Sequence, residues 1–383
     1  MLVSQKRTAD PSVQTVHSSS MGRLHARMSE YLEARAGRAL ARDASVFFSP
    51  ARYGYFRPGP VVAVREADIV ATYWIGGAYI APESLATINK PLVWRLSDIW
   101  PFSGGCHYPG TCEHFERQCG DCPQLRQPGP EDMSRRLWLR KHYAWHALDL
   151  TIVTPSHWMA GLARRSTLFS GRRIEVIPTG VDLDCYRPGD RQAARARWKL
   201  PQDRLLVLFG AMSPTDDARK GYRELRQALD VVARSPIASE VLAVVFGNET
   251  PLSEDLPVPV VSLGRLQGDD ALSAVYNCAD VVVVPSLEDN LPNVALEAIA
   301  CGAPVVAFDV CGMPDIVRNG WNGRLVKSGD PDGLGRAIVE MLQAGDSFLT
   351  IRSNARNYAE ENFSLTKQAN SYLRLYEEVL SGH

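Results

Sequence analysis

Residues 285–308 have the sequence PSLEDNLPNVALEAIACGAPVVAF. The four valines that precede it, residues 281–284, predict a short buried strand that ends at the first proline of the stretch. Residues 293–300 predict a helix, which the following Gly-Ala-Pro sequence ends, and residues 305–308 predict a second buried strand. The stretch therefore predicts a β-loop-α-β unit, the repeating element of an open parallel sheet.

Two acidic residues, Asp289 and Glu297, lie on either side of the loop in this unit. The ligand crevice of an open parallel sheet lies outside the carboxyl ends of its strands. We therefore expect Asp289 at the mouth of a crevice and Glu297 about one turn inside the helix that faces it. The N-terminus of a helix favours bound anions. An ordinary buried unit would explain the valines but not the Asn-Leu-Pro-Asn loop, so a nucleotide-sugar site is the preferred interpretation.

Apolar runs alternate with helical patterns along the rest of the chain, which predicts α/β layers around parallel sheets. The predicted strands are at 69–74, 92–96, 150–154 and 174–177 in the first half, and at 205–209, 241–246, 258–263, 281–284, 304–308 and 324–326 in the second.

The composition sets the class of protein without deciding its function. The 383 residues predict about two domains, and 45% hydrophobic with 22% charged residues is ordinary for a globular protein. A net charge of −1 gives no reason to expect nucleic acid as a partner. No apolar run approaches the roughly 18 residues of a transmembrane helix, and the N-terminus lacks the apolar core of a signal peptide. We expect a cytoplasmic protein.

The stretch that begins at Pro285 resembles the E-x7-E signature of the retaining glycosyltransferases of family 4, which have the GT-B fold. The first acid of the signature is here Asp289 instead of the usual Glu. The resemblance extends through Glu-Ala-x-Ala-Cys-Gly-x-Pro-Val-Val to Pro314-Asp-Ile-Val and to Asn322-Gly. It covers essentially the whole chain and implies two Rossmann-like domains that face a central cleft.

The resemblance implies an acceptor-side domain at residues 1–180 and a nucleotide-sugar-binding domain at 181–362, with a C-terminal helix at 363–383 that packs back on the first domain. Relatives begin with a strand, a Gly-rich loop and a helix ahead of the segment that corresponds to residues 1–7. The N-terminal domain is therefore expected to lack its usual first β-loop-α unit. A misassigned start codon, a truncated chain and a natural shortening are the alternatives, of which the first is preferred.

The resemblance also implies an activity, which is the transfer of a sugar from a nucleotide-diphosphate sugar with retention of the anomeric configuration. The expected donor is a UDP- or GDP-sugar, and no catalytic metal is expected. Lys220 corresponds to the lysine that meets the donor diphosphate in relatives. Their neighbouring Arg is here Ala211, and Arg219 is the candidate that replaces its charge.

The remaining donor-side roles follow from the same signature. By resemblance Glu297 accepts hydrogen bonds from the ribose hydroxyls of the donor, and Asp289 lies near the transferred sugar as a candidate catalytic residue. Asn290, Leu291 and Asn293 belong to the loop that approaches the phosphates with its backbone amides.

On the acceptor side, Asp98 is the second candidate catalytic residue. Relatives carry His-Asp where this chain has Ser97-Asp98, and serine can form hydrogen bonds but cannot carry a proton near neutral pH. A turn-forming role for Asp98 at the end of a strand is an equally weighted alternative. His107 follows in the same loop, and no role is assigned to it.

Four of the eight cysteines, Cys106, Cys112, Cys119 and Cys122, are clustered with the spacing C-x5-C-x6-C-x2-C. The last pair, in Cys-Gly-Asp-Cys, resembles a zinc knuckle, and in a cytosolic protein such clustering favours metal over disulfides. Four thiolates predict a closed structural Zn²⁺ site. Reduced thiols or a redox pair are the alternatives, and His107 and His114 are alternative ligands. The Cys-rich insertion resembles the branch associated with bacterial exopolysaccharide assembly.

The expected acceptor is a glycan or a lipid-linked molecule. The basic segment 133–146 would be the face that contacts the inner membrane surface, while a solvated helix face is the plainer interpretation. A phosphorylase or epimerase would need different phosphate-site residues. The rival of another class is a degenerate, non-catalytic glycan- or nucleotide-binding protein, which the departures at Ser97, Ala211 and Asp289 favour.

Overall fold

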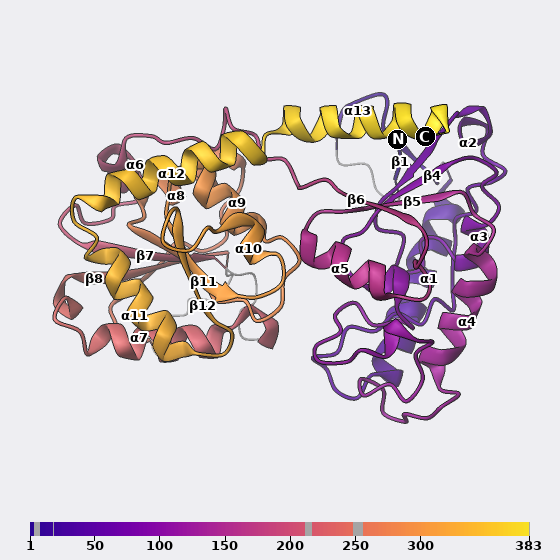
Figure 1. The fold of residues 1–383 in the computed structure, drawn as a ribbon, viewed down its shortest axis with the longest axis horizontal. Helices are drawn as coiled ribbons and strands as arrows, with labels where there is room; N and C mark the ends of the chain where they lie inside the picture. The colour runs from indigo at the N-terminus through magenta and orange to yellow at the C-terminus, as the bar shows by residue number, and fades with distance from the viewer. Residues whose placement is uncertain (4–7, 18, 211–216, 248–255, 383) are drawn as a thin grey trace. The chain divides into compact units, whose positions relative to one another are not determined.

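The computed structural model describes residues 1–3, 8–17, 19–210, 217–247 and 256–382. The chain divides into two compact units (Figure 1). Unit 1 comprises residues 1–155, 159–176 and 374–383, and unit 2 comprises residues 156–158 and 177–373. Each unit is built around its own parallel sheet, as the alternation of apolar runs and helical patterns predicts.

Unit 2 contains a six-stranded sheet with the order β12-β11-β10-β7-β8-β9, in which all neighbouring strands are parallel. The strand order reverses between β7 and β10, because β8 and β9 extend the sheet on one side of β7 and β10 to β12 extend it on the other. This is the topological switch point at which doubly wound sheets bind ligands. The strands are β7 (Leu205–Gly210), β8 (Val241–Phe246), β9 (Val260–Ser262), β10 (Val281–Val284), β11 (Val305–Asp309) and β12 (Gly323–Lys327).

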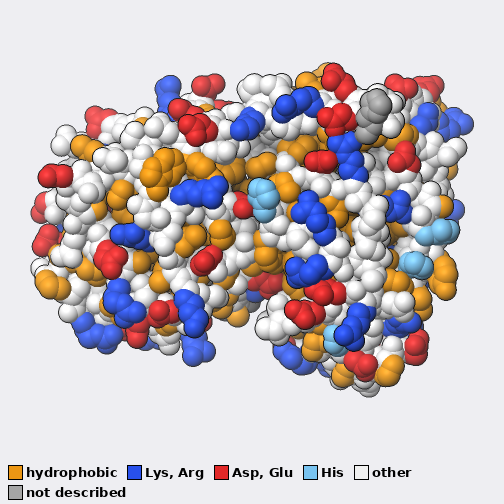
Figure 2. Space-filling view, in the orientation of Figure 1, with side chains coloured by type: hydrophobic (Ala, Val, Ile, Leu, Met, Phe, Trp, Pro, Cys, Tyr) orange, Lys and Arg blue, Asp and Glu red, His pale blue; other side chains and the backbone are white. Residues whose placement is uncertain are grey.

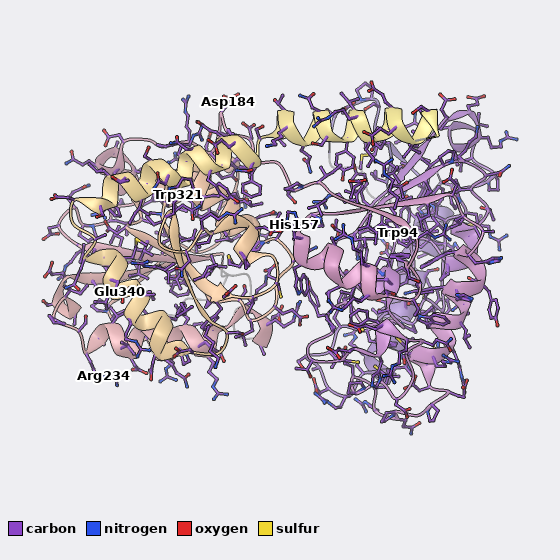
Figure 3. All side chains as sticks on the ribbon, in the orientation of Figure 1. Trp94, His157, Asp184, Arg234, Trp321 and Glu340 are labelled. Atoms are coloured by element: carbon purple, nitrogen blue, oxygen red, sulfur yellow. The ribbon has the colours of Figure 1, made fainter. Side chains whose placement is uncertain are left out.

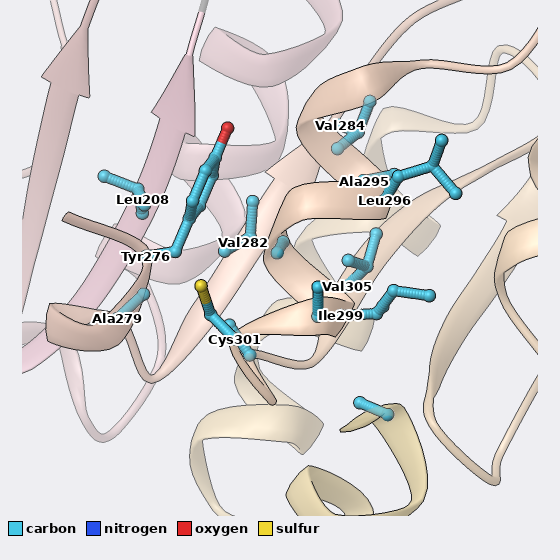
Figure 4. Packing of buried hydrophobic residues seen from close by; sticks show 14 of the residues in the cluster. Leu208, Tyr276, Ala279, Val282, Val284, Ala295, Leu296, Ile299, Cys301 and Val305 are labelled. Atoms are coloured by element: carbon cyan, nitrogen blue, oxygen red, sulfur yellow. The ribbon is translucent and has the colours of Figure 1, made fainter. Parts of the chain in front are cut away.

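Helices cover both faces of this sheet, and alternate strand residues pack against each set. On one face Leu208 and Val282 pack with Tyr276 of α8 and Ile299 of α9 (Figure 4). On the other face the intervening strand residues pack against α7 and α11. Strands buried on both faces account for the unbroken apolar runs in the sequence. The helices of this unit are α6 (Arg191–Arg197), α7 (Tyr222–Ala233), α8 (Asp269–Cys278), α9 (Asn293–Ala300), α10 (Met313–Ile316), α11 (Pro331–Leu342) and α12 (Ser347–Asn362).

The predicted β-loop-α-β unit is present as β10, α9 and β11. The helix α9 begins after Pro292, which fixes the backbone at its N-terminus but offers no side-chain cap. It ends at Cys301, and Gly302 follows in the left-handed region with a φ of 69°. A glycine directly after a helix is the expected stop signal.

Unit 1 contains a four-stranded parallel sheet with the order β3-β4-β5-β6. A separate parallel pair is formed by the two short strands β1 and β2. Each of the predicted strand segments thus overlaps one of the strands β3 to β12. The strands of unit 1 are β1 (Leu2–Val3), β2 (Gln14–Thr15), β3 (Val70–Thr72), β4 (Leu92–Arg95), β5 (Leu150–Thr154) and β6 (Arg173–Val176).

The helices of unit 1 bury aromatic and polar side chains. Trp94 of β4, labelled in Figure 3, packs edge-on against Trp145 of α4 with 5.1 Å between the ring centroids. Glu33 of α1 is buried, and its carboxylate accepts the N–H of Ala51 at 2.6 Å and that of Arg52 at 3.0 Å. The helices are α1 (Ser20–Leu40), α2 (Val62–Glu66), α3 (Pro82–Leu85), α4 (Met133–Trp145) and α5 (His157–Arg165), of which the first two residues belong to unit 2.

The last helix, α13 (Leu365–Ser381), contributes to both units. Its residues up to 373 belong to unit 2, and those from 374 belong to unit 1. Within unit 1, Glu378 of this helix forms an ion pair with Arg173 of β6.

None of the helices in the described part of the chain is long and apolar enough to cross a membrane. On the face drawn in Figure 2, Lys and Arg side chains are interspersed with Asp and Glu in both units, as the near-neutral net charge suggests. The predicted basic helix is α4, but two of its cations are already engaged. The guanidinium of Arg140 binds Glu83 at 2.8 and 3.0 Å, and Lys141 is fully buried.

Candidate functional site

A cavity of about 530 Å³ lies at the carboxyl ends of β7, β8 and β10 in unit 2. Gly210 and Gly247 line it where β7 and β8 end, and Pro285 lines it where β10 ends. The first residues of α9 line the facing wall. The cavity is therefore at the topological switch point, where the sequence predicts a crevice.

Lys220 and Asp289 lie together in this cavity. The Nζ atom of Lys220 is 2.8 Å from Oδ2 of Asp289, and the two side chains are 39% and 21% exposed. Their ion pair joins the loop after β7 to the loop after β10. It places a positive and a negative group in one half-buried pocket.

Gly221 makes this approach possible. It has a φ of 68° and begins α7 directly after the 3-10 turn η3 (Ala218–Lys220). A Cβ atom at this position would be 1.8 Å from the carbonyl oxygen of Pro285, which is far too close for any side chain. Beside it, the N–H of Leu287 donates to the carbonyl of Arg219 at 2.7 Å. Only glycine allows the two loops to meet here.

The N-terminus of α9 faces the same cavity. Pro292, Asn293 and Val294 line it, and no side chain caps the helix. The free amides and the dipole of a helix N-terminus attract anions. Together with the ammonium of Lys220, they give the cavity two kinds of group that can bind phosphate.

Arg219 is held by a neighbour. Its Nε and Nη2 atoms donate to the carboxylate of Asp217 at 3.0 and 2.7 Å. Of the described residues that line the cavity, Asp217 is one and Arg219 is not. Ala211, where relatives carry arginine, lies outside the described residues.

The predicted loop residues 290, 291 and 293 have three different surroundings. Asn290 is buried, and its Oδ1 accepts a hydrogen bond of 2.7 Å from Ser156 of the same unit. Leu291 is buried and lines the cavity, while Asn293 is exposed and also lines it. Asn290 therefore stabilises the loop, and the other two contribute surface to the cavity.

Glu297 lies one turn further along α9. Its Oε2 accepts a hydrogen bond of 2.7 Å from the hydroxyl of Tyr276, a fully buried residue of α8. Burial raises the pKa of Glu297 above its ordinary 4.5, although the hydrogen bond from Tyr276 acts in the opposite direction. Glu297 is not among the described residues that line the cavity. Sequence reasoning missed Tyr276, because an apolar helix gives no signal for a phenol that meets a carboxylate.

Asp98 follows β4 in unit 1 and is buried in a chain of hydrogen bonds. Its Oδ1 accepts the N–H of Trp100 at 2.9 Å, and its Oδ2 is 2.8 Å from Nδ1 of His107. The other ring nitrogen of His107 is 2.8 Å from Oγ of Ser49. His107 is fully buried, and the sequence alone assigns it no role. In the structure it orients Asp98.

The clustered cysteines of unit 1 line one small enclosure. Cys106, Cys112, Cys119 and Cys122 surround a space of about 10 Å³ together with His114, and all four are free thiols. Burial raises the pKa of Cys119 to about 12 and that of Cys122 to about 11. In the described part of the chain no three His, Cys, Asp or Glu side chains form a coordination sphere. The thiols are gathered without reaching coordinating positions.

The two histidines that were considered as alternative ligands differ in their surroundings. His107 is engaged on both ring nitrogens by Asp98 and Ser49. His114 lines the enclosure, and its Nδ1 is 2.8 Å from the carbonyl oxygen of Gly120.

Comparisons with known proteins identify the family. A sequence profile described as "Glycosyl transferases group 1" matches residues 203–344. The D-inositol 3-phosphate glycosyltransferase of Mycolicibacterium gilvum is 34% identical over 325 residues, which are 80% of this chain and 68% of the relative. D-inositol 3-phosphate glycosyltransferase 2 of Catenulispora acidiphila is 34% identical over 324 residues, 79% and 72% of the two chains. The chain belongs to the group 1 glycosyltransferases. Other matches are shorter. The match to the Rhodococcus erythropolis relative extends over 221 residues and covers 49% of that protein.

Solved structures show the fold of this group 1 glycosyltransferase. Sucrose-phosphate synthase from Thermosynechococcus elongatus superposes with a TM-score of 0.61 at 21% identity, over 82% of this chain and 74% of that chain. Anabaena HepE in complex with UDP superposes with a TM-score of 0.59 at 20% identity, over 82% and 80%. The predicted α/β class with the GT-B arrangement of two Rossmann-like domains is thereby confirmed. Members of the family are transferase enzymes, as the resemblance implies.

Proposed function

We propose that this chain is a retaining glycosyltransferase that moves a sugar from a nucleotide-diphosphate sugar to a glycan or lipid-linked acceptor. The observation that carries the proposal is the pairing of Lys220 with Asp289, 2.8 Å apart in one cavity beside the N-terminus of α9. A cation and free helix amides suit a diphosphate, and a carboxylate beside them suits the sugar that the diphosphate carries.

The donor diphosphate would replace Asp289 as the partner of Lys220. The charged oxygens of the diphosphate interact with the ammonium more strongly than a single carboxylate does. Asp289 can then bind the hydroxyls of the sugar. Arg219 supplies a second cation only when its guanidinium leaves Asp217. The amides after Pro292 would bind the phosphate from the other side.

Glu297 is proposed to accept hydrogen bonds from the ribose hydroxyls of the donor. Tyr276 holds one carboxylate oxygen at 2.7 Å, so the other oxygen is fixed in direction. A carboxylate in a buried position binds hydroxyl groups through charge-assisted hydrogen bonds. The role requires Glu297 to be ionised when the donor binds.

In the proposed reaction the acceptor hydroxyl forms a bond to the anomeric carbon on the face from which the diphosphate leaves. The bond between that carbon and the diphosphate oxygen breaks, and the leaving oxygen takes the proton of the acceptor. Lys220 and the amides of α9 stabilise the charge that develops on the diphosphate. Asp289 stabilises the positive charge at the anomeric carbon.

For Asp98 we propose a role on the acceptor side. Its carboxylate is held by hydrogen bonds with Trp100 and His107. It therefore offers hydrogen-bond-accepting oxygens in a fixed orientation at the carboxyl end of β4. The same bonds also support the turn-forming role, and a substitution separates the two. Loss of transfer with unchanged stability supports an acceptor role, whereas loss of stability alone supports a turn.

The names of related proteins, and the ligands in their structures, suggest which substrates to test. Structures of Anabaena HepE contain UDP and UDP-glucose, which favours a UDP-sugar ahead of a GDP-sugar. The relatives named D-inositol 3-phosphate glycosyltransferases make D-inositol 3-phosphate a small acceptor worth testing. The Cys-rich insertion favours glycan assembly of the exopolysaccharide type, at the cytoplasmic side of the membrane.

A degenerate, non-catalytic glycan- or nucleotide-binding protein is the second candidate. It is favoured by the way the charged side chains in and beside the cavity are paired with each other. Lys220 is bound to Asp289 and Arg219 to Asp217. Such a protein would bind nucleotide without turning over any donor.

The first test is a thermal-shift series with UDP, GDP, ADP and dTDP. A nucleotide at about 100 times its Kd stabilises the native state by about 2.7 kcal/mol. The sugar donors of the selected base are then incubated with acceptors, and the anomeric configuration of the product is read by NMR. Retained configuration supports the proposal, and an inverted product contradicts it. Binding without hydrolysis or transfer of any donor supports the non-catalytic alternative.

A further inference from the structure

We propose that Cys106, Cys112, Cys119 and Cys122 bind one Zn²⁺ ion through four thiolates and so form a closed structural site in unit 1. The site is separate from the cavity of unit 2, and the proposal does not depend on the proposed transfer reaction. Four observations support it: the clustering of the cysteines, the backbone of the turn, an amide directed at sulfur and a buried lysine.

The four cysteines come from 17 residues of chain but surround one enclosure of about 10 Å³. A space of this size is about that of one water molecule, so it suits a single ion and not a cluster of several metal atoms. Phe48, Phe115 and Pro109 also line the enclosure. A closed tetrahedral thiolate site is the arrangement that Zn²⁺ prefers.

The turn that carries the last two cysteines has an unusual backbone. Cys119, Gly120 and Asp121 all have positive φ, with values of 52°, 94° and 46°. Two of the three are not glycine, so the turn is unfavourable by itself and needs a compensating interaction. This conformation folds the chain so that Cys122 returns to the same enclosure as Cys119. A shared metal ion would provide the compensation.

A backbone amide is directed at one of the sulfur atoms. The N–H of Gly104 donates to Sγ of Cys119 at 3.2 Å. An amide donor suits a thiolate far better than a neutral thiol, which is a weak acceptor. Outer groups of this kind orient and stabilise the ligands of a metal.

A buried cation lies beside the cluster. Lys141 is fully buried, donates to the carbonyl oxygens of Ser103 at 2.9 Å and of Trp100, and lies 3.8 Å from the ring centre of Trp100. In the described part of the chain no carboxylate is within ion-pair distance of it. Burial lowers the pKa of Lys141 to about 7, and the neighbouring Cys119, Cys106 and Asp98 act in the opposite direction by favouring its charged form. One Zn²⁺ with four thiolates has a net charge of −2, which would compensate a buried ammonium.

Binding would require the sulfurs to close on the ion to about 2.3 Å each. The site would then hold together the segment between β4 and α4. Cys106 directly precedes His107, which orients Asp98, so the ion would also hold this hydrogen-bonded chain in place. His114 could replace one cysteine as a ligand, and the substitutions below distinguish that arrangement.

The test is the zinc content of the full chain, purified under reducing conditions without chelator and measured by plasma mass spectrometry. We expect about one zinc per chain. Cys119→Ser and Cys122→Ser should each lose most of it, and His114→Ala should retain it. The matched control is Cys185→Ser, because Cys185 belongs to unit 2 and lies outside the enclosure. Equal zinc loss in the control would contradict the assignment.

A second measurement keeps the proposal testable if the serine variants do not fold. The wild-type chain is loaded with Co²⁺, and its absorption spectrum is recorded. Thiolate-to-cobalt bands together with the intense visible bands of tetrahedral cobalt support four-sulfur coordination. A folded wild-type chain without zinc, with no cobalt bands and with these cysteines reactive to a thiol reagent, overturns the proposal. An intact mass that is lower by the hydrogens of a disulfide also overturns it.

Discussion

The hydroxyl of Tyr276 donates a hydrogen bond of 2.7 Å to the carboxylate of Glu297 from a different helix of unit 2. Tyr276 is packed among Leu208, Val282 and Cys301, so its position is fixed by the core (Figure 4). The proposed ribose-binding group is thus oriented by a residue that belongs to the hydrophobic core.

Tyr276→Phe should weaken nucleotide binding. The substitution keeps the aromatic ring but removes the donor that orients Glu297, and one hydrogen bond to a charged group contributes about 1.5–3 kcal/mol. Part of that energy should appear as a loss of affinity for UDP of roughly 10-fold, which calorimetry measures. Tyr358→Phe is the control, because its hydroxyl bonds to the carbonyl of Asp315 at 3.1 Å in the same unit. An unchanged affinity in Tyr276→Phe would remove this role.

Lys220→Met should weaken the binding of nucleoside diphosphates but not of the nucleoside. The ammonium is proposed to bind the diphosphate, and losing one charge-assisted hydrogen bond costs about 1.5–3 kcal/mol, or about 10- to 150-fold in Kd. Titration of the variant with UDP and with uridine separates the phosphate contribution from that of the base. Lys327→Met, at the exposed end of β12, is the control. Equal losses for UDP and uridine would contradict the assignment.

Gly221→Ala should destabilise unit 2 strongly. The new Cβ would be 1.8 Å from the carbonyl oxygen of Pro285, and the φ of 68° disfavours alanine by about 1–2 kcal/mol even without a clash. The control Gly329→Ala has a φ of 71° with nothing within 4 Å of the new Cβ. Urea unfolding should give a much larger loss of stability for Gly221→Ala. Similar losses for both variants would mean that the two loops separate easily.

Nucleotide affinity should fall when the pH drops through the raised pKa of Glu297. Burial favours the protonated form of this side chain, so its pKa lies above 4.5 and the carboxylate that binds ribose is lost at a higher pH than for an ordinary glutamate. Asp269 raises the pKa further, and Tyr276 lowers it. Glu297→Gln should bind UDP more weakly at pH 7 and lack this pH dependence.

The stability of the fold should change in the opposite direction over the same window. Between 4.5 and the raised pKa the native state binds more protons at Glu297 than the unfolded state does, so its contribution to stability falls as the pH rises. Urea unfolding of the wild type and Glu297→Gln, compared at pH 4.5 and pH 7, tests this sign. If Glu297→Gln is destabilised relative to the wild type more at pH 7 than at pH 4.5, the linkage has the opposite sign.

His107→Ala should destabilise unit 1. The substitution removes both ring hydrogen bonds and leaves the buried carboxylate of Asp98 with a single amide donor, and a buried polar group that loses its partner costs about 1–3 kcal/mol. His146→Ala at the exposed end of α4 serves as the comparison. Denaturant unfolding should separate the two variants clearly. If both unfold at the wild-type midpoint, the chain from Asp98 to Ser49 contributes little.

The strands could be predicted from the sequence because each carries its own signal. The valines of residues 281–284 are buried on both faces, and a short unbroken run of β-branched residues is typical of a strand in that position. The resemblance to family 4 places Lys220 and Asp289 at the same donor site, and in the structure both line one cavity.

The partners of the side chains could not be predicted in the same way. Arg219 binds Asp217, and Glu297 binds a residue 21 positions away on another helix. These contacts depend on how helices pack and on which rotamers remain free, and no local pattern encodes either. His107 was given no role for the same reason, because its two partners lie 9 and 58 positions away.

The division of α13 between the two units has a consequence for synthesis. Residues 374–383 belong to unit 1, whose other segments end at residue 176. During translation unit 1 is therefore complete only after residues 374–383 have been made, whereas all the segments of unit 2 have been made by residue 373. The middle of the chain can finish folding before its beginning does, which reverses the usual order in which domains mature on the ribosome.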